Sequence, residues 1–385
     1  MFLSSTILFR PRRMSSQGIW KLATLPFIRV RHRCCPTRSS TRSFERSLGF
    51  DCQVNCREAS TGKHSHARGR SARYAPAMNL AKLLAPRDPQ LQQLAKDLYA
   101  EREDLRQAFP DPAGAEYLGW LGSHGVLAYE TIAAHYPALP PEGLRATACG
   151  GLGLEGHLMT GVADFRTVGE LFEVFSGRSI ESLRSVLDFG CGCGRLLRWF
   201  HTALPECQLL GADVREATAK WCGDHLPGTF LYNGTEPPLD LPDESADLTV
   251  ALSVFSHLSR EQSLPWMKEL VRVTKKDGLI LVSTHGAFAL AVTMRSLEHQ
   301  RGLKIPGDEV PELLRNLCRD GFLHRVSPAE TLGRADGVSD DYGETFLTER
   351  FAREQWGTVA EVLGCVPVAL NLFQDVFALR PKRGG

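Results

Sequence analysis

The feature that most constrains this chain is a glycine-rich stretch, VLDFGCGCGR, at residues 186–195. The apolar residues before it are typical of the end of a buried strand, and the RLLRWF that follows is typical of a helix. In open α/β sheets, ligands bind at such strand-to-helix turns, along the carboxyl edge of the strands. Glycine is needed there because the backbone turns tightly, partly with positive φ, and because a Cβ would keep a ligand from the main chain. The stretch therefore predicts an α/β fold with a ligand site at this turn.

From residue 185 onward, short apolar runs alternate with helical segments, which is the pattern of a parallel sheet covered by helices on both faces. We predict a doubly wound, mostly parallel, Rossmann-like sheet of seven strands. The strands are expected at SVLDFG (185–190), CQLLGADV (207–214), TFLYNG (229–234), ADLTVALSVF (246–255), LILVST (279–284), VLGCVPVAL (362–370) and QDVFALR (374–380).

The clearest helix lies between the fourth and fifth of these strands. Ser259 and Gln262 form a capping box, and apolar residues recur after them at helical spacing. Lys275, Lys276 and Gly278 supply the charges and the glycine that favour a helix end, so we expect the helix to stop there.

Charge divides the chain into unlike regions. Residues 1–77 hold 15 Lys and Arg against 3 Asp and Glu, whereas the remainder holds 30 against 41. The basic region has the composition of an organelle transit peptide, and the alternative is a disordered leader with Met78 opening the folded protein. It carries the charge of an arm that binds nucleic acid but no recognition motif, so no nucleic-acid partner is predicted.

Three segments follow from this division and from the patterns. We expect a leader over 1–77, a helical prefix or lid over 78–180, and the main domain over 181–383, with a helical insertion at about 286–345. In the prefix, an amphipathic helix is predicted after Asp88, and a broken helical region at 115–136.

Membrane and metal partners are not predicted. No run approaches the roughly 18 apolar residues that a membrane-spanning helix needs. The eleven cysteines include four in the leader, and the other seven lack C-x-x-C pairs and matching histidines, so they form no zinc-ligand pattern. Scattered cysteines fit a reducing compartment without disulfides, which favours a cytoplasmic location, or an organelle if the leader is a true transit peptide.

The spacing of the glycines discriminates between ligands. A nicotinamide or flavin fold is expected to show G-x-G-x-x-G, with a helix N-terminus presented to a pyrophosphate. Here Gly190, Gly192 and Gly194 give G-x-G-x-G, and Asp188 lies two residues ahead. An acidic side chain is a poor neighbour for pyrophosphate but a good one for a cationic group. Cys191 is expected to fill space in the turn rather than to bind a metal.

On these residues the sequence resembles the class I S-adenosylmethionine-dependent methyltransferases over about 185–285. The resemblance implies that VLDFGCGCGR wraps the methionine part of S-adenosylmethionine (SAM) and that Asp213, which ends LLGAD, accepts hydrogen bonds from the ribose hydroxyls. Thr235 stands where such enzymes often carry an aspartate near the adenine. The cofactor-binding residues implied are Asp188, Gly190, Cys191, Gly192, Gly194, Asp213, Val214, Gly234, Thr235 and Ser253.

The stretches LPPEGLRATACGG and NLFQDVFALR look like a bacterial subgroup of general methyltransferase-domain proteins. The function implied is methyl transfer from SAM to an O or N atom of a small-molecule or glycan-like acceptor. The alternatives are a nicotinamide-dependent oxidoreductase and a SAM-binding protein without catalysis. The oligomeric state stays open.

Two histidines are candidates for the base that an oxygen acceptor requires. His257 follows the fourth predicted strand and His285 ends the fifth, so both fall on the carboxyl edge of the sheet. A packing role is the alternative for each. His157 and Tyr342 could approach the acceptor from the prefix and the insertion, although packing explains them equally well.

Overall fold

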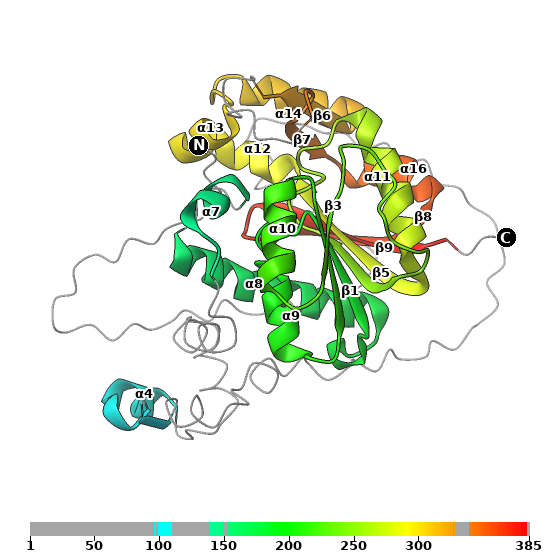
Figure 1. The fold of residues 1–385 in the computed structure, drawn as a ribbon. Helices are drawn as coiled ribbons and strands as arrows, with labels where there is room; N and C mark the ends of the chain where they lie inside the picture. The colour runs from blue at the N-terminus through cyan, green and yellow to red at the C-terminus, as the bar shows by residue number, and fades with distance from the viewer. Residues whose placement is uncertain (1–95, 98, 110–138, 149–152, 328–338, 383–385) are drawn as a thin grey trace, which may run out of the picture. The chain divides into compact units, whose positions relative to one another are not determined.

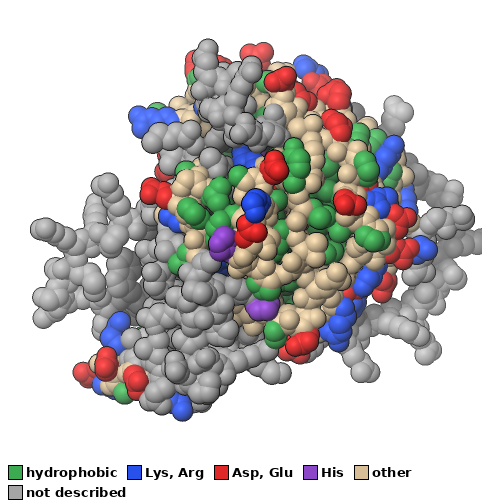
Figure 2. Space-filling view, viewed as in Figure 1, with side chains coloured by type: hydrophobic (Ala, Val, Ile, Leu, Met, Phe, Trp, Pro, Cys, Tyr) green, Lys and Arg blue, Asp and Glu red, His purple; other side chains and the backbone are tan. Residues whose placement is uncertain are grey.

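The computed structural model describes residues 96–97, 99–109, 139–148, 153–327 and 339–382 (Figure 1). The predictions for the leader and for residues 115–136 lie outside these residues, as does most of the helix expected after Asp88. The described part of the prefix forms α4 (Glu103–Ala108), α7 (Glu142–Ala148) and α8 (Leu154–Ser176). None of the helices described is long and apolar enough to cross a membrane. On the face drawn in Figure 2, acidic and basic side chains are intermixed rather than gathered by sign.

The seven predicted strands all form, and they lie in one sheet. Its order is β3-β2-β1-β4-β5-β9-β8, and every strand runs parallel to its neighbours except β9, which is antiparallel to β5 and β8. The strands are β1 (Ser185–Phe189), β2 (Gln208–Asp213), β3 (Thr229–Tyr232), β4 (Ala246–Ala251), β5 (Thr274–His285), β8 (Ala360–Leu370) and β9 (Gln374–Pro381). β1 and β4 are buried along their whole length because helices cover both faces, which explains their continuous apolar runs.

The insertion before the last two strands is not purely helical, which corrects our prediction. It begins with helices α12 (Ala287–Thr293), α13 (Leu297–Leu303) and α14 (Val310–Asp320). An antiparallel hairpin of β6 (Phe322–Val326) and β7 (Gly343–Leu347) follows. β7 joins the sheet where Phe346 pairs with His285 at the end of β5, so the sheet has nine strands rather than seven. The hairpin thus adds residues to the carboxyl edge of the sheet.

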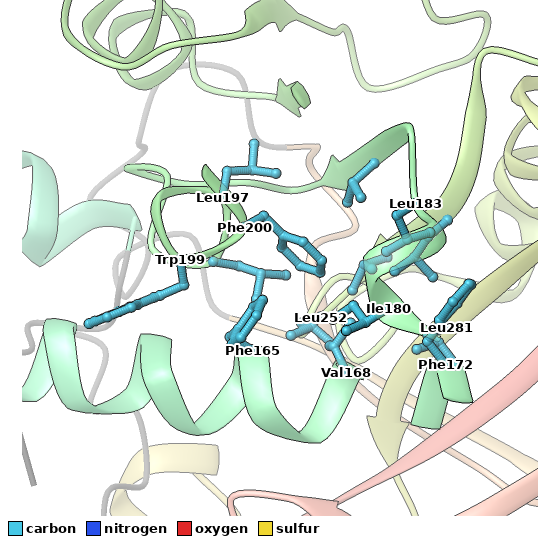
Figure 3. Packing of buried hydrophobic residues seen from close by; sticks show 14 of the residues in the cluster. Phe165, Val168, Phe172, Ile180, Leu183, Leu197, Trp199, Phe200, Leu252 and Leu281 are labelled. Atoms are coloured by element: carbon cyan, nitrogen blue, oxygen red, sulfur yellow. The ribbon is translucent and has the colours of Figure 1, made fainter. Parts of the chain in front are cut away.

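The helices that flank the sheet form two layers with separate apolar cores, and the insertion helices α12, α13 and α14 share a third cluster with Phe346 of β7. On one face, α8 and α9 (Leu197–Ala203) pack against the sheet, and Phe165 meets Phe200 edge-on with ring centroids 5.0 Å apart (Figure 3). α10 (Glu216–His225) contributes Cys222 to the same core. On the other face, Trp266 of α11 (Arg260–Val273) and Phe351 of α16 (Glu349–Gln355) lie in the second core. Two short 3₁₀ turns, η1 (Ile180–Ser182) and η2 (Trp356–Thr358), complete the layers.

Helix α11 begins as predicted but ends earlier. The capping box of Ser259 and Gln262 is present. Lys275, Lys276 and Gly278 do not end the helix, however, because β5 already starts at Thr274. The Thr274 hydroxyl closes the helix by donating to the carbonyl of Leu270 at 2.6 Å.

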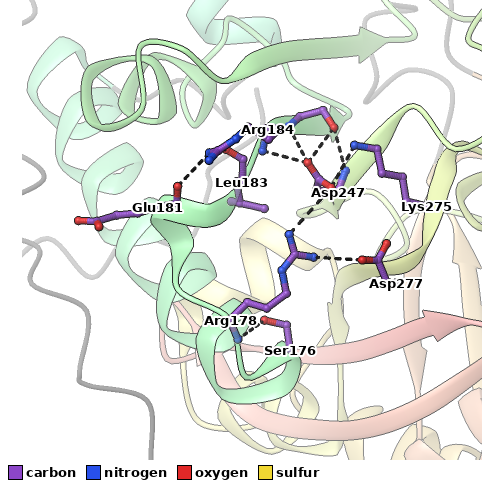
Figure 4. A network of polar contacts seen from close by, with 9 residues as sticks. Ser176, Arg178, Glu181, Leu183, Arg184, Asp247, Lys275 and Asp277 are labelled. Carbon is purple, nitrogen blue, oxygen red and sulfur yellow. Dashed lines mark hydrogen bonds and ion pairs between the residues drawn. The ribbon is translucent and has the colours of Figure 1, made fainter.

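A polar network fixes the amino-terminal edge of the sheet, opposite the predicted site (Figure 4). Asp247 at the start of β4 accepts hydrogen bonds from the backbone N–H groups of Arg184 and Ser185 at 2.9 and 3.0 Å. Lys275 donates to the same carboxylate at 3.1 Å. Burial raises the pKa of Asp247, but the Arg184 N–H and Lys275 outweigh it, so the net pKa lies below its ordinary value. The network joins the start of β1 to β4 and β5.

Candidate functional site: the carboxyl edge of the sheet

The glycine turn adopts the backbone that the sequence predicts. Gly190, Gly192 and Gly194 have φ of 81°, 51° and 68°, all in the left-handed region. A Cβ on Gly190 would lie 2.3 Å from Cγ2 of Val254, which follows β4. The N–H groups of Gly190 and Cys191 donate to the carbonyl of Ala212 in β2 at 2.7 and 3.0 Å. The turn is therefore held between the ends of β2 and β4.

Replacing Gly190 with alanine is expected to lower the free energy of unfolding by roughly 2–4 kcal/mol, because it combines left-handed strain with a clash against Val254. Gly143 is the matched control, since a Cβ there meets nothing within 4 Å. Urea denaturation of both variants is the measurement. If Gly190→Ala were as stable as Gly143→Ala, the turn would not be under the constraint described.

The turn and Asp213 are brought together. Asp213 ends β2 and is 4% exposed. Its Oδ2 accepts the N–H of Gly192 at 2.9 Å, and its Oδ1 accepts the N–H of Arg215 at 2.9 Å. Asp188, the other predicted acidic residue, is buried in β1 beside Gly211 and Val250 of the flanking strands. Both carboxylates thus occupy the same edge of the sheet as the glycines.

The side chain of Cys191 belongs to the apolar core rather than to the turn's outer surface. Its neighbour Cys222 and its burial raise the pKa of the Cys191 thiol well above the ordinary value. All six cysteines of the described part are free thiols. The thiol stays neutral, and because the side chain is buried in that core, the main chain is the part of Cys191 that a ligand at the turn can meet.

A residue that sequence reasoning missed lies after β3. Asn233 is 7% exposed, and its N–H donates to the carbonyl of Asp213 at 3.0 Å. Its Nδ2 donates to the carbonyl of Gly234 at 3.0 Å, whereas its Oδ1 is buried without a hydrogen-bond partner. Of the predicted residues here, Gly234 and Thr235 are exposed and Val214 is half-buried. The sequence feature that could have indicated Asn233 is its position near the end of the predicted strand at 229–234, at the carboxyl edge of the sheet.

The ends of β4, β5 and β9 meet around one glutamine. Ser253 has a φ of 58°, and its N–H donates to the Ser283 hydroxyl at 2.7 Å. Both serine hydroxyls donate to Oε1 of Gln374, at 3.2 Å from Ser253 and 2.6 Å from Ser283. The amide nitrogen of Gln374 lies 3.3 Å from Nε2 of His285. Gln374 therefore joins the predicted Ser253 to the predicted His285.

The two candidate histidines lie near each other, with ring centroids 6.4 Å apart. Nδ1 of His257 lies 2.9 Å from the carbonyl of Gly343. A carbonyl only accepts hydrogen bonds, so Nδ1 carries the hydrogen and Nε2 keeps its lone pair. Burial lowers the pKa of His257 to about 4 and that of His285 to about 3, so both rings are neutral at physiological pH. His157, by contrast, is fully buried within α8.

Glu344 of β7 was not foreseen, and it lies between these histidines. Its Oε2 is 3.8 Å from Nδ1 of His257 and 3.6 Å from Nδ1 of His285. Burial raises the pKa of Glu344 to about 8. The Tyr342 ring stacks on His257 with centroids 4.7 Å apart. These residues form the histidine–glutamate cluster, defined here as His257, His285, Tyr342 and Glu344.

Stability should depend on pH through this cluster, with opposite signs for its members. The folded-state pKa values of the two histidines lie below the ordinary 6.5, so the unfolded chain binds protons more readily than the folded one. As pH falls below 6.5, His257 and His285 therefore lower the free energy of unfolding. The folded-state pKa of Glu344 lies above the ordinary 4.5, so its contribution is lost as pH rises from 4.5 to about 8. Urea denaturation at a series of pH values should show Glu344→Gln gaining stability relative to the wild type across that window. A difference independent of pH would contradict the assignment.

Comparisons with known proteins bear on this site. Residues 186–278 match the protein family described as a methyltransferase domain. A probable S-adenosylmethionine-dependent methyltransferase from Mycolicibacterium smegmatis is 33% identical over 101 residues, which are 26% of this chain. The chain spans 38% of the length of that relative.

Two solved structures are similar to the chain at low identity. The PH0226 protein from Pyrococcus horikoshii is 13% identical, with a TM-score of 0.38 over 57% of this chain and 90% of that one. PKMT2 from Rickettsia typhi in complex with AdoHcy is 17% identical, with a TM-score of 0.35 over 57% of this chain and 53% of that one.

The segment that matches the methyltransferase-domain family, residues 186–278, contains the glycine turn, the acidic residue that ends β2, and the strands β2, β3 and β4.

Proposed function

We propose that this protein transfers a methyl group from SAM to an oxygen or nitrogen atom of a small-molecule or glycan-like acceptor. The observation that carries the proposal is the closure of the glycine turn on Asp213, through the hydrogen bond from Gly192 N–H. A turn whose three glycines lack side chains, lying beside a buried carboxylate, suits a ligand that is cationic at one end and bears a ribose at the other.

The residues present fit SAM. A carboxylate has about four acceptor sites, so the two backbone bonds of Asp213 do not exhaust it, and ribose hydroxyls can donate to the same oxygens. The unpartnered Oδ1 of Asn233 is an acceptor for the amino group of adenine. Asp188 adds a negative charge at the base of the turn, where a cationic group is favoured.

When bound, SAM supplies an electrophilic methyl group. The chain's task is to position the acceptor in line with that group and to exclude water, which can supply several kcal/mol. His257 is the residue best placed to take a proton from an oxygen acceptor, because its ring is neutral and its Nε2 is the nitrogen left to accept. Its side chain is 20% exposed, whereas that of His285 is 5% exposed.

Calorimetric titration of the full chain with SAM and, separately, with NAD tests the cofactor. Binding of SAM without binding of NAD is expected, and the reverse would make the protein a nicotinamide-dependent enzyme. Transfer of label from methyl-labelled SAM to a panel of hydroxyl and amine compounds tests catalysis. Binding without any transfer would favour a SAM-binding protein that does not catalyse.

A further inference from the structure

Two buried polar atoms of the histidine–glutamate cluster face each other without a hydrogen-bond partner. They are Oε2 of Glu344 and Nδ1 of His285, which lie 3.6 Å apart. The two side chains are 7% and 5% exposed. Buried polar atoms in folded proteins are nearly always hydrogen-bonded, and 3.6 Å is too long for a direct bond. Each atom therefore has capacity for a partner that the chain does not supply.

The neighbours fix which atom donates. Oε1 of Gln374 accepts from two serine hydroxyls, so its amide nitrogen is the atom facing Nε2 of His285. That nitrogen is a donor, so Nε2 of His285 accepts and Nδ1 carries the hydrogen. Nδ1 of His257, which also carries its hydrogen, faces the same Glu344 oxygen at 3.8 Å. The pair thus presents an N–H donor from His285 and an acceptor oxygen from Glu344.

The strand that carries Glu344 is held firmly against the His257 loop. The N–H of Thr345 donates to the carbonyl of Ser256 at 2.8 Å, and its hydroxyl donates to the carbonyl of Leu258 at 2.6 Å. On the other side of Glu344, the carbonyl of Gly343 accepts from His257. These bonds on both sides keep the 3.6 Å separation from closing by a simple shift of β7.

A hydroxyl group is the chemical group that satisfies both atoms, because its single oxygen both donates and accepts. Two atoms 3.6 Å apart can each lie about 2.8 Å from one hydroxyl oxygen. Both atoms are buried, so a hydroxyl group reaches them only when neighbouring side chains move aside. Because the pKa of Glu344 is raised to about 8, its carboxyl group is largely protonated near neutral pH, and a hydroxyl group can pair with it in either protonation state. An ammonium group lacks the acceptor that the His285 N–H needs.

We propose that Glu344 and His285 bind a hydroxyl group of the acceptor, next to the atom that receives the methyl group. This inference rests on the proposed function, in which His257 faces the reacting atom. Because His257 is part of the same cluster, the two polar groups of the acceptor are neighbours, as in a vicinal diol of a sugar or a catechol. Glu344 is an acceptor-binding residue in this scheme, and the insertion hairpin determines specificity.

Matched pairs of compounds test the proposal on the full chain. The pairs are cis-1,2-cyclohexanediol with cyclohexanol, and catechol with phenol, each measured by calorimetry with S-adenosylhomocysteine present and by transfer from labelled SAM. The wild type should prefer the diol of at least one pair by roughly tenfold or more, since the extra hydroxyl fills buried hydrogen-bonding capacity. Glu344→Leu should reduce that preference to less than about threefold.

Two further variants keep the test decisive. Glu344→Gln retains an acceptor oxygen and a similar volume, so it should retain most of the preference even if Glu344→Leu folds poorly. Glu354, an exposed residue of α16, supplies the control variant Glu354→Leu, which should behave as the wild type.

The outcomes separate this inference from the proposed function. The inference is overturned if the wild type shows no preference for the diol in either pair. It is also overturned if the preference persists in Glu344→Leu. In both cases the proposed SAM binding and methyl transfer are unaffected. Failure of the wild type to bind SAM or S-adenosylhomocysteine overturns the proposed function itself.

Discussion

Asp213→Ala is expected to weaken SAM binding at least tenfold in calorimetry. Hydrogen bonds to a charged acceptor are worth about 1.5–3 kcal/mol each, and a ribose offers two hydroxyls. The substitution also removes the bonds that Asp213 accepts from Gly192 and Arg215, so the turn loses an anchor. Asp224→Ala is the matched control, because Asp224 is an exposed residue that pairs with Lys220 on the surface of α10.

A second ligand separates ribose binding from anchoring of the turn. The wild type should bind a 2′,3′-dideoxy analogue of S-adenosylhomocysteine more weakly than S-adenosylhomocysteine, whereas Asp213→Ala should bind the two alike. If Asp213→Ala still discriminated between them, the carboxylate would only anchor the turn, and its assignment to the ribose would be wrong.

The glycine turn and its contact with the end of β2 were predictable from sequence because their determinants are local. The strand before the turn, the three glycines and the acidic end of the next strand lie within residues 186–213, and each has a distinct pattern. The positive φ of Gly190 follows from the turn itself, whereas the close approach of Val254 comes from the end of β4 and adds to that constraint. The position of Asn233 after β3 was visible in the sequence, but its buried oxygen without a hydrogen-bond partner was not.

The other half of the site was not predictable, because a long-range pairing builds it. β6 and β7 join residues 322–326 to 343–347, and the second of these strands buries Glu344 and Thr345. The segment lay in the predicted helical insertion at about 286–345, and a charged and a hydroxyl residue in a short run do not indicate a buried strand. Glu344 becomes buried between the two histidines because β7 of the hairpin pairs with β5, and this burial raises the pKa of Glu344. The sequence alone does not reveal that pairing.

The end of α11 shows the same limit on a smaller scale. Lys275 and Lys276 have the charge of a helix C-terminus, and Gly278 has the freedom of a C-cap, so the local pattern favoured a later end. In the structure Lys275 instead pairs with Asp247 across the edge of the sheet. Residues from Thr274 onward form a strand rather than a helix end because β5 pairs with β4, and local sequence patterns do not indicate such a pairing.

His257→Phe is expected to reduce turnover of an oxygen acceptor by a factor of about 10² to 10⁴, the usual contribution of a positioned general base. Phenylalanine keeps a ring against Tyr342 and removes the nitrogen that would take the proton. An amine that arrives deprotonated needs no such help, so its methylation should be much less affected. SAM affinity should stay close to that of the wild type. Rates from labelled SAM with matched hydroxyl and amine compounds measure the difference.

His225 gives a matched control for this substitution. It is also a stacked histidine, 4.8 Å from Trp221, and its ring bonds a backbone carbonyl, but it is exposed on α10. His225→Phe should retain full turnover.

The pH dependence of the wild type gives a further check. Because the pKa of His257 is about 4, its ring stays neutral at physiological pH, so protonation of His257 should reduce the wild-type rate only as pH approaches 4. Undiminished methylation of a hydroxyl compound by His257→Phe would remove the base from the mechanism and leave positioning of the acceptor as the chain's main contribution.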